Sequence, residues 1–171
     1  MKDIFFIYDN CCFYEIVTLG YFMRFSGCDT AFCSPKGKPV RAMEGFTVQP
    51  DLPFEELDRA QIRSFILPGG AAATVNNREL HVLLQELNEK RVLIAGICAG
   101  VDVLDDAGIL RDVRSTHSTE EDLVHDRNIV TARANAHVDF AFETASALGL
   151  FTDEKDLQET LAFWKHHQRM Q

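Results

Sequence analysis

Residues 93–100 read LIAGICAG, and this stretch decides the fold. An apolar run over 92–95 has the length of a buried strand and breaks at Gly96, and a helix-like segment follows over 101–107. Cys98 therefore lies on a sharp turn between strand and helix, with a glycine two residues before it and another two residues after it. This spacing, G-x-C-x-G, is the cysteine form of the nucleophile elbow.

The chemistry of an elbow explains the spacing. A side chain two residues before or after the nucleophile would collide with neighbouring backbone, so glycine is required at both positions. The turn also places the sulfur of Cys98 at a helix N-terminus, where free N–H groups and the helix dipole favour the thiolate. The pattern predicts a nucleophile whose pKa is lower than that of a free thiol. The alternative is a buried structural cysteine between two unrelated glycines.

Length and composition favour a single soluble domain spanning residues 1–171. Hydrophobic residues make up 46% and charged residues 25%, as in ordinary globular proteins. A net charge of −9 with no basic run argues against nucleic acid as a partner. No apolar segment reaches the roughly 20 residues that a membrane span needs, and the N-terminus lacks the pattern of a signal peptide. Five cysteines, an odd number without framework spacing, predict a reducing, cytoplasmic location.

Strand-like and helix-like segments alternate along the chain. Strands are expected over 4–8, 29–33, 62–67, 92–95, 114–116 and 128–131, and helices over 13–25, 78–89, 101–107, 138–148 and 153–167. A small hairpin is expected over 40–48, and a short helix at most over 54–57. This alternation predicts an α/β three-layer sandwich, a mostly parallel sheet with helices on both faces. In such a fold the site lies beyond the carboxyl ends of the strands.

Three loops should meet at that edge, namely 9–13, 68–72 and 96–100. The backbone N–H groups of Gly69 and Gly70, together with that of Ala99, could form an oxyanion hole or a cradle for an oxidised sulfur. The alternative for the glycine pair is an ordinary turn at the end of a strand. Glu15 lies among apolar residues on the first turn of the first helix, which predicts a role in the site. The alternative is a solvated or capping carboxylate.

Other side chains could assist Cys98. Of six histidines, His117 is the best placed as a base, and the alternative is a surface loop residue. His125 lies in a polar loop and His137 at the start of a helix, so their positions are explained without a role in the site. The remaining histidines lie on helices away from the site. Cys11 or Cys12 in the first loop could resolve an oxidised Cys98, although both could simply fill the loop. His166 and His167 lack a second ligand pair, so no metal site is predicted.

The chain resembles the ThiJ/PfpI superfamily. The resemblance rests on LPGG at 67–70, AGICAG at 95–100 and the early Glu15, and extends to NIVTAR at 128–133 and VDFA at 138–141. It implies a flavodoxin-like fold of the class I glutamine amidotransferase type and a homodimer. It also implies that Cys98 is the reactive cysteine, that the Glu15 carboxyl hydrogen-bonds it, and that Gly70 and Ala99 supply backbone donors.

Two differences from known members of the superfamily narrow the range of activities that the resemblance implies. Peptidases and class I chaperones of the superfamily carry His after the cysteine, whereas this chain has Ala99, so the simplest Cys–His dyad is missing. Isonitrile hydratases usually have Asp in the first helix and Thr after the cysteine, and Glu15 and Ala99 match neither. A glutamate together with Cys-Ala resembles the branch of the superfamily linked to glyoxalase or deglycase chemistry and to oxidation sensing.

The sequence therefore predicts cofactor-free thiol chemistry on a small electrophile such as a 2-oxoaldehyde. Cys98 would attack the carbonyl, Glu15 would move a proton, and Gly70 and Ala99 would stabilise the oxyanion. The first alternative is a non-catalytic redox sensor or stress-response protein in which an oxidant converts Cys98 to sulfinate. The second is an amidase-like or peptidase-like hydrolase.

Overall fold

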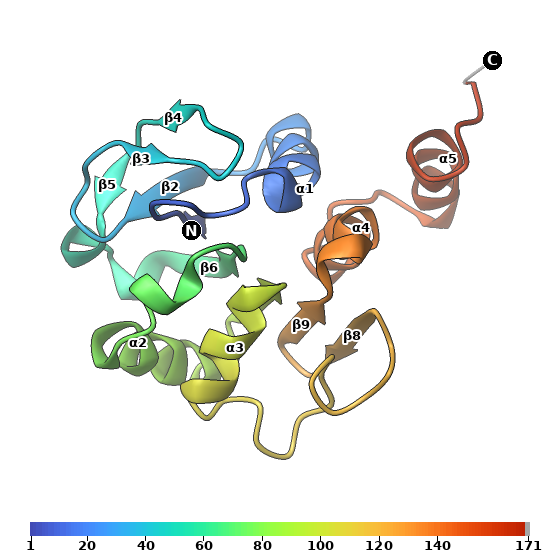
Figure 1. The fold of residues 1–171 in the computed structure, drawn as a ribbon. Coiled ribbons are helices and arrows are strands. Elements are labelled where there is room, and N and C mark those ends of the chain that lie inside the picture. The colour runs from blue at the N-terminus through green and yellow to red at the C-terminus, as the bar shows by residue number, and fades with distance from the viewer. Residues whose placement is uncertain (170–171) are drawn as a thin grey trace.

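A seven-stranded sheet forms the centre of the fold (Figure 1). The computed structural model describes residues 1–169. The strand order is β5-β2-β1-β6-β7-β9-β8, and only the pair β8–β9 is antiparallel. The strands are β1 (Lys2–Phe6), β2 (Thr30–Ser34), β5 (Leu52–Pro53), β6 (Ile62–Leu67), β7 (Leu93–Ile97), β8 (Leu123–Asp126) and β9 (Ile129–Ala132).

Helices cover both faces of the sheet, as the alternation predicts. On one face α1 (Tyr14–Phe25) packs against α4 (His137–Ala147), and on the other α2 (Arg78–Glu89) lies beside α3 (Ala99–Asp106) (Figure 1). The last helix, α5 (Glu154–Trp164), stands at the periphery beyond α4, and none of its residues is buried. The fold is thus an α/β sandwich with three layers.

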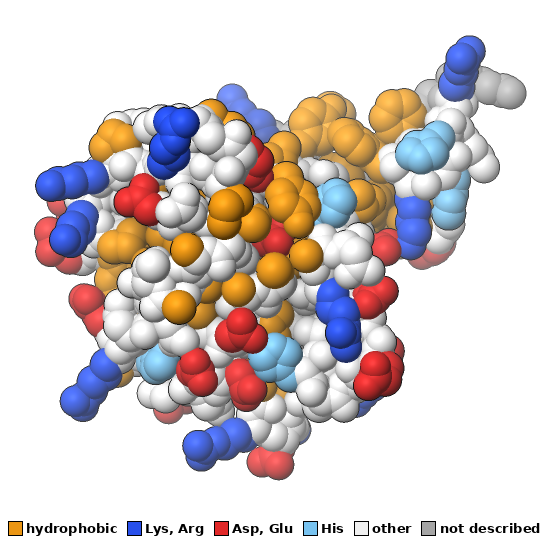
Figure 2. Space-filling model, viewed as in Figure 1, with side chains coloured by type: hydrophobic (Ala, Val, Ile, Leu, Met, Phe, Trp, Pro, Cys, Tyr) orange, Lys and Arg blue, Asp and Glu red, His pale blue; other side chains and the backbone are white. Residues whose placement is uncertain are grey.

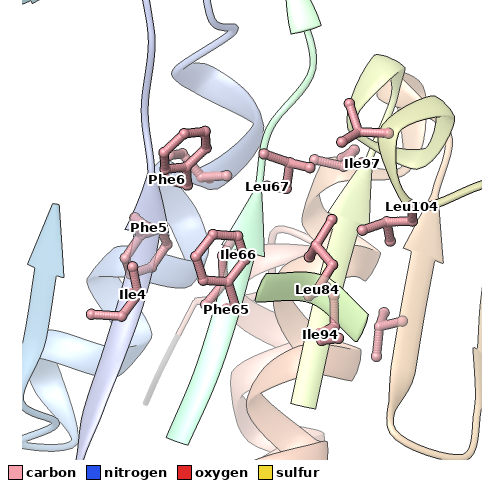
Figure 3. Packing of buried hydrophobic residues seen from close by; sticks show 14 of the residues in the cluster. Ile4, Phe5, Phe6, Phe65, Ile66, Leu67, Leu84, Ile94, Ile97 and Leu104 are labelled. Atoms are coloured by element: carbon pink, nitrogen blue, oxygen red, sulfur yellow. The ribbon is translucent and has the colours of Figure 1, made fainter. Parts of the chain in front are cut away.

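The central strands are buried on both faces, which explains their continuous apolar sequences. In β1, β6 and β7 the buried side chains interdigitate with those of the flanking helices (Figure 3). The apolar stripe of α2, residues Leu80, Leu83, Leu84 and Leu87, is at most 1% exposed. The Asn77 side chain caps this helix by accepting hydrogen bonds from the N–H groups of Glu79 and Leu80.

The hairpin and the short helix occur as predicted. β3 (Val40–Arg41) and β4 (Thr47–Val48) pair antiparallel, with Val40 opposite Val48. A single 3-10 turn covers Phe54–Glu56. Among residues 1–169, no helix has both the length and the apolar character needed to span a bilayer.

The strand predicted over 114–116 does not form. The N–H of Arg114 donates to the Asp126 carboxylate and that of Thr116 to the Thr131 hydroxyl, so this segment is a turn-rich loop held by side chains. The edge strand in this region is instead β8, which the sequence analysis missed. The last helix also ends at Trp164, three residues before the predicted end.

We expect Gly100→Ala to lower the free energy of unfolding by about 2–3 kcal/mol, because overpacking against rigid backbone strains the fold. A β-carbon at position 100 would lie 2.4 Å from the carbonyl oxygen of Leu67. Gly20→Ala in α1 is the matched control, since its β-carbon would meet only Phe5, at 3.9 Å. Alanine should stabilise that position by up to about 1 kcal/mol. Urea denaturation measures both variants, and equal midpoints would contradict the expected clash.

Candidate active site

Cys98 occupies the turn between β7 and α3. Its backbone has φ 55° and ψ −129°, a left-handed conformation that is strained for a residue with a side chain. Two hydrogen bonds hold it there: its N–H donates to the carbonyl of Ala132 at 2.9 Å, and its carbonyl accepts from Val101 at 3.0 Å. This is the strand–turn–helix geometry of a nucleophile elbow.

The two glycines of the motif are needed because a side chain at either position would collide with its neighbours, as the spacing predicts. A β-carbon at Gly96 would lie 2.6 Å from Cδ1 of Leu104 on α3. One at Gly100 would meet the end of β6, at the Leu67 carbonyl. Strand, turn and helix can pack this closely only without side chains at positions 96 and 100.

The three loops that were expected at this edge do converge. Cys11 forms an isolated bridge with Gly70, and the N–H of Cys12 donates to the carbonyl of Gly69 at 3.0 Å. A β-carbon at Gly69 would lie 2.6 Å from Cβ and 2.9 Å from Sγ of Cys98. The glycine pair therefore lies between the first loop and the elbow, in direct contact with both.

Glu15 is buried in this junction, with 1% of its surface exposed. Its Oε2 accepts the N–H of Gly69 at 2.6 Å, and the Tyr14 hydroxyl donates to its Oε1 at 3.5 Å. The carboxyl also lies close enough to the Cys98 side chain for each group to shift the pKa of the other. Glu15 therefore already accepts the N–H of Gly69, which is one of the three backbone donors expected at an oxyanion hole.

The pKa values of the two groups are linked. Burial raises the pKa of Glu15, although hydrogen bonds from Gly69, Cys98 and Tyr14 oppose the rise. Burial also raises the pKa of Cys98, and a negative charge on Glu15 raises it further, whereas the N–H groups of Ala99 and Gly70 lower it. The predicted lowering of the thiol pKa by the helix N-terminus is therefore outweighed. Two acidic groups in contact compete for one proton and titrate as a pair.

Tyr8 supports the glycine loop, a role that the sequence analysis missed. Its hydroxyl donates to the carbonyls of Pro68 and Gly69, at 2.7 Å and 2.8 Å, and the side chain is buried. Burial raises the pKa of Tyr8, so the phenol stays protonated and remains a donor. The only signal in the sequence is a tyrosine at the carboxyl end of a buried apolar run.

The histidines are arranged differently from the prediction. His117 lies 3.2 Å from Asp102 and from Asp105 on α3, and within residues 1–169 it makes no hydrogen bond with Cys98. His125 pairs with Glu143. His137, which the helix start seemed to account for, packs its ring against Tyr14 with centroids 5.4 Å apart.

All five cysteines are free thiols. Cys11 is fully buried and Cys12 is partly exposed, and burial raises the pKa of each to about 11. Neither is hydrogen-bonded to Cys98 in the part of the chain that the structure describes. Over the same residues, no group of three or more His, Cys, Asp or Glu side chains is arranged to hold a metal ion.

Relatives with curated names are similar to part of this chain. A protein named deglycase from Pyrococcus abyssi is 29% identical over 105 residues, which are 60% of this chain and 63% of the relative. One from Thermococcus kodakarensis is 31% identical over 83 residues, 47% of this chain and 49% of the relative. The matched segments thus span less than two thirds of these relatives' own lengths.

Solved structures resemble the whole fold. A DJ-1 superfamily protein from Agrobacterium tumefaciens superposes with a TM-score of 0.84 at 27% identity, covering 98% of this chain and 100% of that one. Oxidized DJ-1 from Toxoplasma gondii superposes with a TM-score of 0.81 at 20% identity, covering 94% of this chain and 96% of that one. At this identity the likeness concerns the fold alone. The model of the DJ-1/PfpI family matches residues 1–147, which include the Cys98 elbow, the glycine loop and Glu15. The chain belongs to the DJ-1/PfpI family, as its motifs indicated.

Proposed function

We propose that the protein is a deglycase-like or glyoxalase-like enzyme that uses Cys98 to attack a small electrophile, a 2-oxoaldehyde. The observation that carries this proposal is the buried Glu15 carboxyl, which accepts the Gly69 N–H and lies close enough to Cys98 to raise the pKa of its thiol. Such a carboxyl can exchange a proton with a substrate that is bonded to the sulfur. The deglycase names of the relatives support the same class of chemistry.

Glu15 and Cys98 share one proton, and in the reactive form of the site this proton is on Glu15. Burial favours a neutral carboxyl, whereas the N–H groups of Ala99 and Gly70 favour charge on sulfur. With Glu15 protonated, the charge that raises the thiol pKa disappears and the carboxyl becomes a hydrogen-bond donor to the thiolate. This assignment explains how a partly buried cysteine whose pKa is raised can still be nucleophilic.

The reaction then runs on residues of this chain alone, with no cofactor. The Cys98 thiolate bonds to the aldehyde carbon, the carbonyl oxygen takes the negative charge, and the N–H groups of Gly70 and Ala99 stabilise it. Glu15 gives its proton to that oxygen, which completes a hemithioacetal. The Glu15 carboxylate next takes the proton from the former aldehyde carbon, which gives an enediolate. Glu15 returns that proton to the neighbouring carbon while the hydroxyl proton on the former aldehyde carbon passes to the 2-oxo oxygen, so a thioester of the 2-hydroxy acid forms. Water hydrolyses the thioester to a 2-hydroxy acid and regenerates the thiol.

A second candidate is a redox sensor in which peroxide converts Cys98 to sulfinate. The same features favour it, because a protonated Glu15 and two backbone N–H groups would bind sulfinate oxygens. A hydrolase of the amidase or peptidase class has less support. It needs a base beside the thiol, and His117 instead contacts Asp102 and Asp105. Five free thiols favour a reducing compartment such as the cytoplasm for any of these functions.

The enzyme proposal predicts that the wild-type protein consumes methylglyoxal without glutathione and forms lactate. Cys98→Ser should abolish this turnover, because the hydroxyl is a far weaker nucleophile. Glu15→Gln keeps a hydrogen-bond donor but cannot exchange a proton, so it should lose turnover yet still form sulfinate under peroxide. Glu15→Leu should lose both, because the thiolate then has no side-chain donor. A time course of lactate, with intact-protein mass after peroxide treatment, measures these outcomes.

Glu55→Gln is the control, since this carboxylate is exposed and lies on the short 3-10 turn after the edge strand β5. One stoichiometric adduct on wild type without lactate would favour the sensor. Equal turnover of wild type and the Glu15 variants would refute the proposed proton transfer.

We also propose that the chain forms a homodimer through an aromatic surface on α1 and α5. Not all aromatic side chains of α1 can face the sheet: Phe22 is buried, whereas Tyr21 is 51% and Phe25 is 82% exposed. Together with Phe163 of α5 they border a groove of about 510 Å³. Hydrophobic side chains gather there in the space-filling view (Figure 2). Association with a second copy would remove this apolar surface from water.

Light scattering should therefore give the dimer mass at micromolar concentrations. Phe25→Asp should shift the mass to that of a monomer, because a carboxylate would be buried in the interface. Val82→Asp on α2, where the valine is 38% exposed, should leave the dimer intact. A monomeric wild-type mass over the same concentrations would refute the proposal.

A further inference from the structure

The hairpin β3–β4 packs against the segment that leads into α1 (Figure 1). In the turn of the hairpin, the N–H of Met43 donates to the carbonyl of Cys11 at 2.9 Å. The rings of Phe13 and Phe46 meet edge-on, with centroids 5.4 Å apart. The turn of the hairpin is therefore fixed to the first loop of the candidate site and to the start of α1.

Glu44, in this turn, caps α1 from outside the helix. The N-cap residue of α1 is Phe13, whose side chain cannot accept a hydrogen bond. Oε1 of Glu44 instead accepts the N–H of Tyr14, the first residue of the helix, at 2.6 Å. The helices α2 and α5, by contrast, are capped by their own N-cap residues, Asn77 and Asp153. The carboxylate at the start of α1 thus comes from a different part of the chain.

The charge of Glu44 lies next to the proposed proton-transfer group, because the residue after Tyr14 is Glu15. A helix N-terminus carries a partial positive charge, which favours the ionised form of a carboxyl in the first turn. A carboxylate bound at the same N-terminus opposes this effect. Burial is the largest cause that raises the pKa of Glu15, and the charge of Glu44 raises it further. The pKa of Cys98 responds chiefly to burial, to Glu15 and to two backbone N–H groups, so Glu44 acts on the carboxyl more than on the thiol.

The groups around Glu15 leave the charge of Glu44 without a counter-ion. Two bases lie in the surrounding elements: His137 of α4, whose ring packs against Tyr14, and Arg41 of β3, whose Nη2 would be 3.7 Å from a β-carbon at position 45. Within residues 1–169, neither forms an ion pair with Glu15 or Glu44. The other titratable groups that face Glu15 are acids, namely Tyr8, Cys11, Cys12, Tyr14 and Cys98.

We propose that Glu44 is a positioning residue that keeps the proton of the acidic pair on Glu15. This inference rests on the proposed function, in which a neutral Glu15 faces the Cys98 thiolate and gives its proton to the substrate oxygen. The negative charge of Glu44 disfavours a second charge on the neighbouring carboxyl, so the charge of the pair stays on sulfur. The hairpin thus acts on the reaction through Glu15.

The test measures the pH at which Glu15 loses its proton. Infrared difference spectra of the full-length protein, each recorded against the same protein carrying Glu15→Gln, follow the neutral-carboxyl band of this side chain as the pH rises. Glu44→Gln removes the charge but keeps an oxygen that can accept the Tyr14 N–H. At low salt it should increase the acid dissociation constant of Glu15 about threefold, the effect of one charge several ångströms away in a water-like medium. The band should therefore disappear at a lower pH than in the wild-type protein.

Salt and two further variants separate the charge from the structure. Because Glu44 is exposed, 1 M NaCl, with a Debye length of about 3 Å, should bring wild type and Glu44→Gln to the same midpoint. Glu44→Ala loses both charge and cap, so it should shift the midpoint at least as far and also unfold at a lower urea concentration. Asp58→Asn is the matched control and should leave the midpoint unchanged. This exposed carboxylate accepts the N–H of Ala60 before the amino end of β6, whereas Cys98 follows the carboxyl end of the parallel strand β7.

Other results overturn the inference. Equal midpoints for wild type and Glu44→Gln at low salt would refute the role of Glu44 and leave a neutral Glu15 standing. A shift that persists in 1 M NaCl, or that occurs only in Glu44→Ala, would refute an effect of the charge. If the wild-type protein has no neutral-carboxyl band at neutral pH, the proposed proton donor fails together with this inference. The expected shift in a protein that forms no lactate from methylglyoxal would support the role of Glu44 and refute the enzyme proposal alone.

Discussion

The backbone at Gly69 approaches Cys98 so closely that a β-carbon at position 69 would lie 2.9 Å from the sulfur. This approach brings the ends of β6 and β7 together, so that backbone atoms and not side chains pack against the turn at Cys98. The N–H of Gly69 points to Glu15, while the next residue, Gly70, supplies a donor to the sulfur. Tyr8 holds the same loop from the other side through two carbonyl groups.

Burial of an acidic pair has a direct chemical consequence. A buried carboxyl and a partly exposed thiol that lie close together cannot both ionise at low cost, so one proton is retained between them. Backbone donors at the sulfur favour the state with the thiolate and the neutral carboxyl. The left-handed conformation of Cys98 belongs to the same arrangement, since strain at a functional residue persists only where the surrounding structure enforces it.

Much of this arrangement could be predicted from the sequence, because its causes are local. The elbow follows from two glycines around Cys98, and the sheet from apolar runs that alternate with helical patterns. The histidines could not be assigned in the same way. His117 is adjacent to the elbow in the topology but contacts carboxylates on α3, whereas His137 reaches Tyr14 only through the packing of α4 on α1. The position of β8 likewise depends on its pairing with β9 and not on its own short sequence.

The central claim is that Glu15 carries the proton of the pair at neutral pH. Infrared difference spectroscopy of the wild-type protein against Glu15→Gln tests it directly, since the carbonyl band of a neutral carboxyl is distinct from that of a carboxylate. The account predicts a neutral-carboxyl band at neutral pH that is absent from Glu15→Gln and disappears only on alkalinisation. A carboxylate band at neutral pH, with the neutral band emerging only in acid, would contradict it.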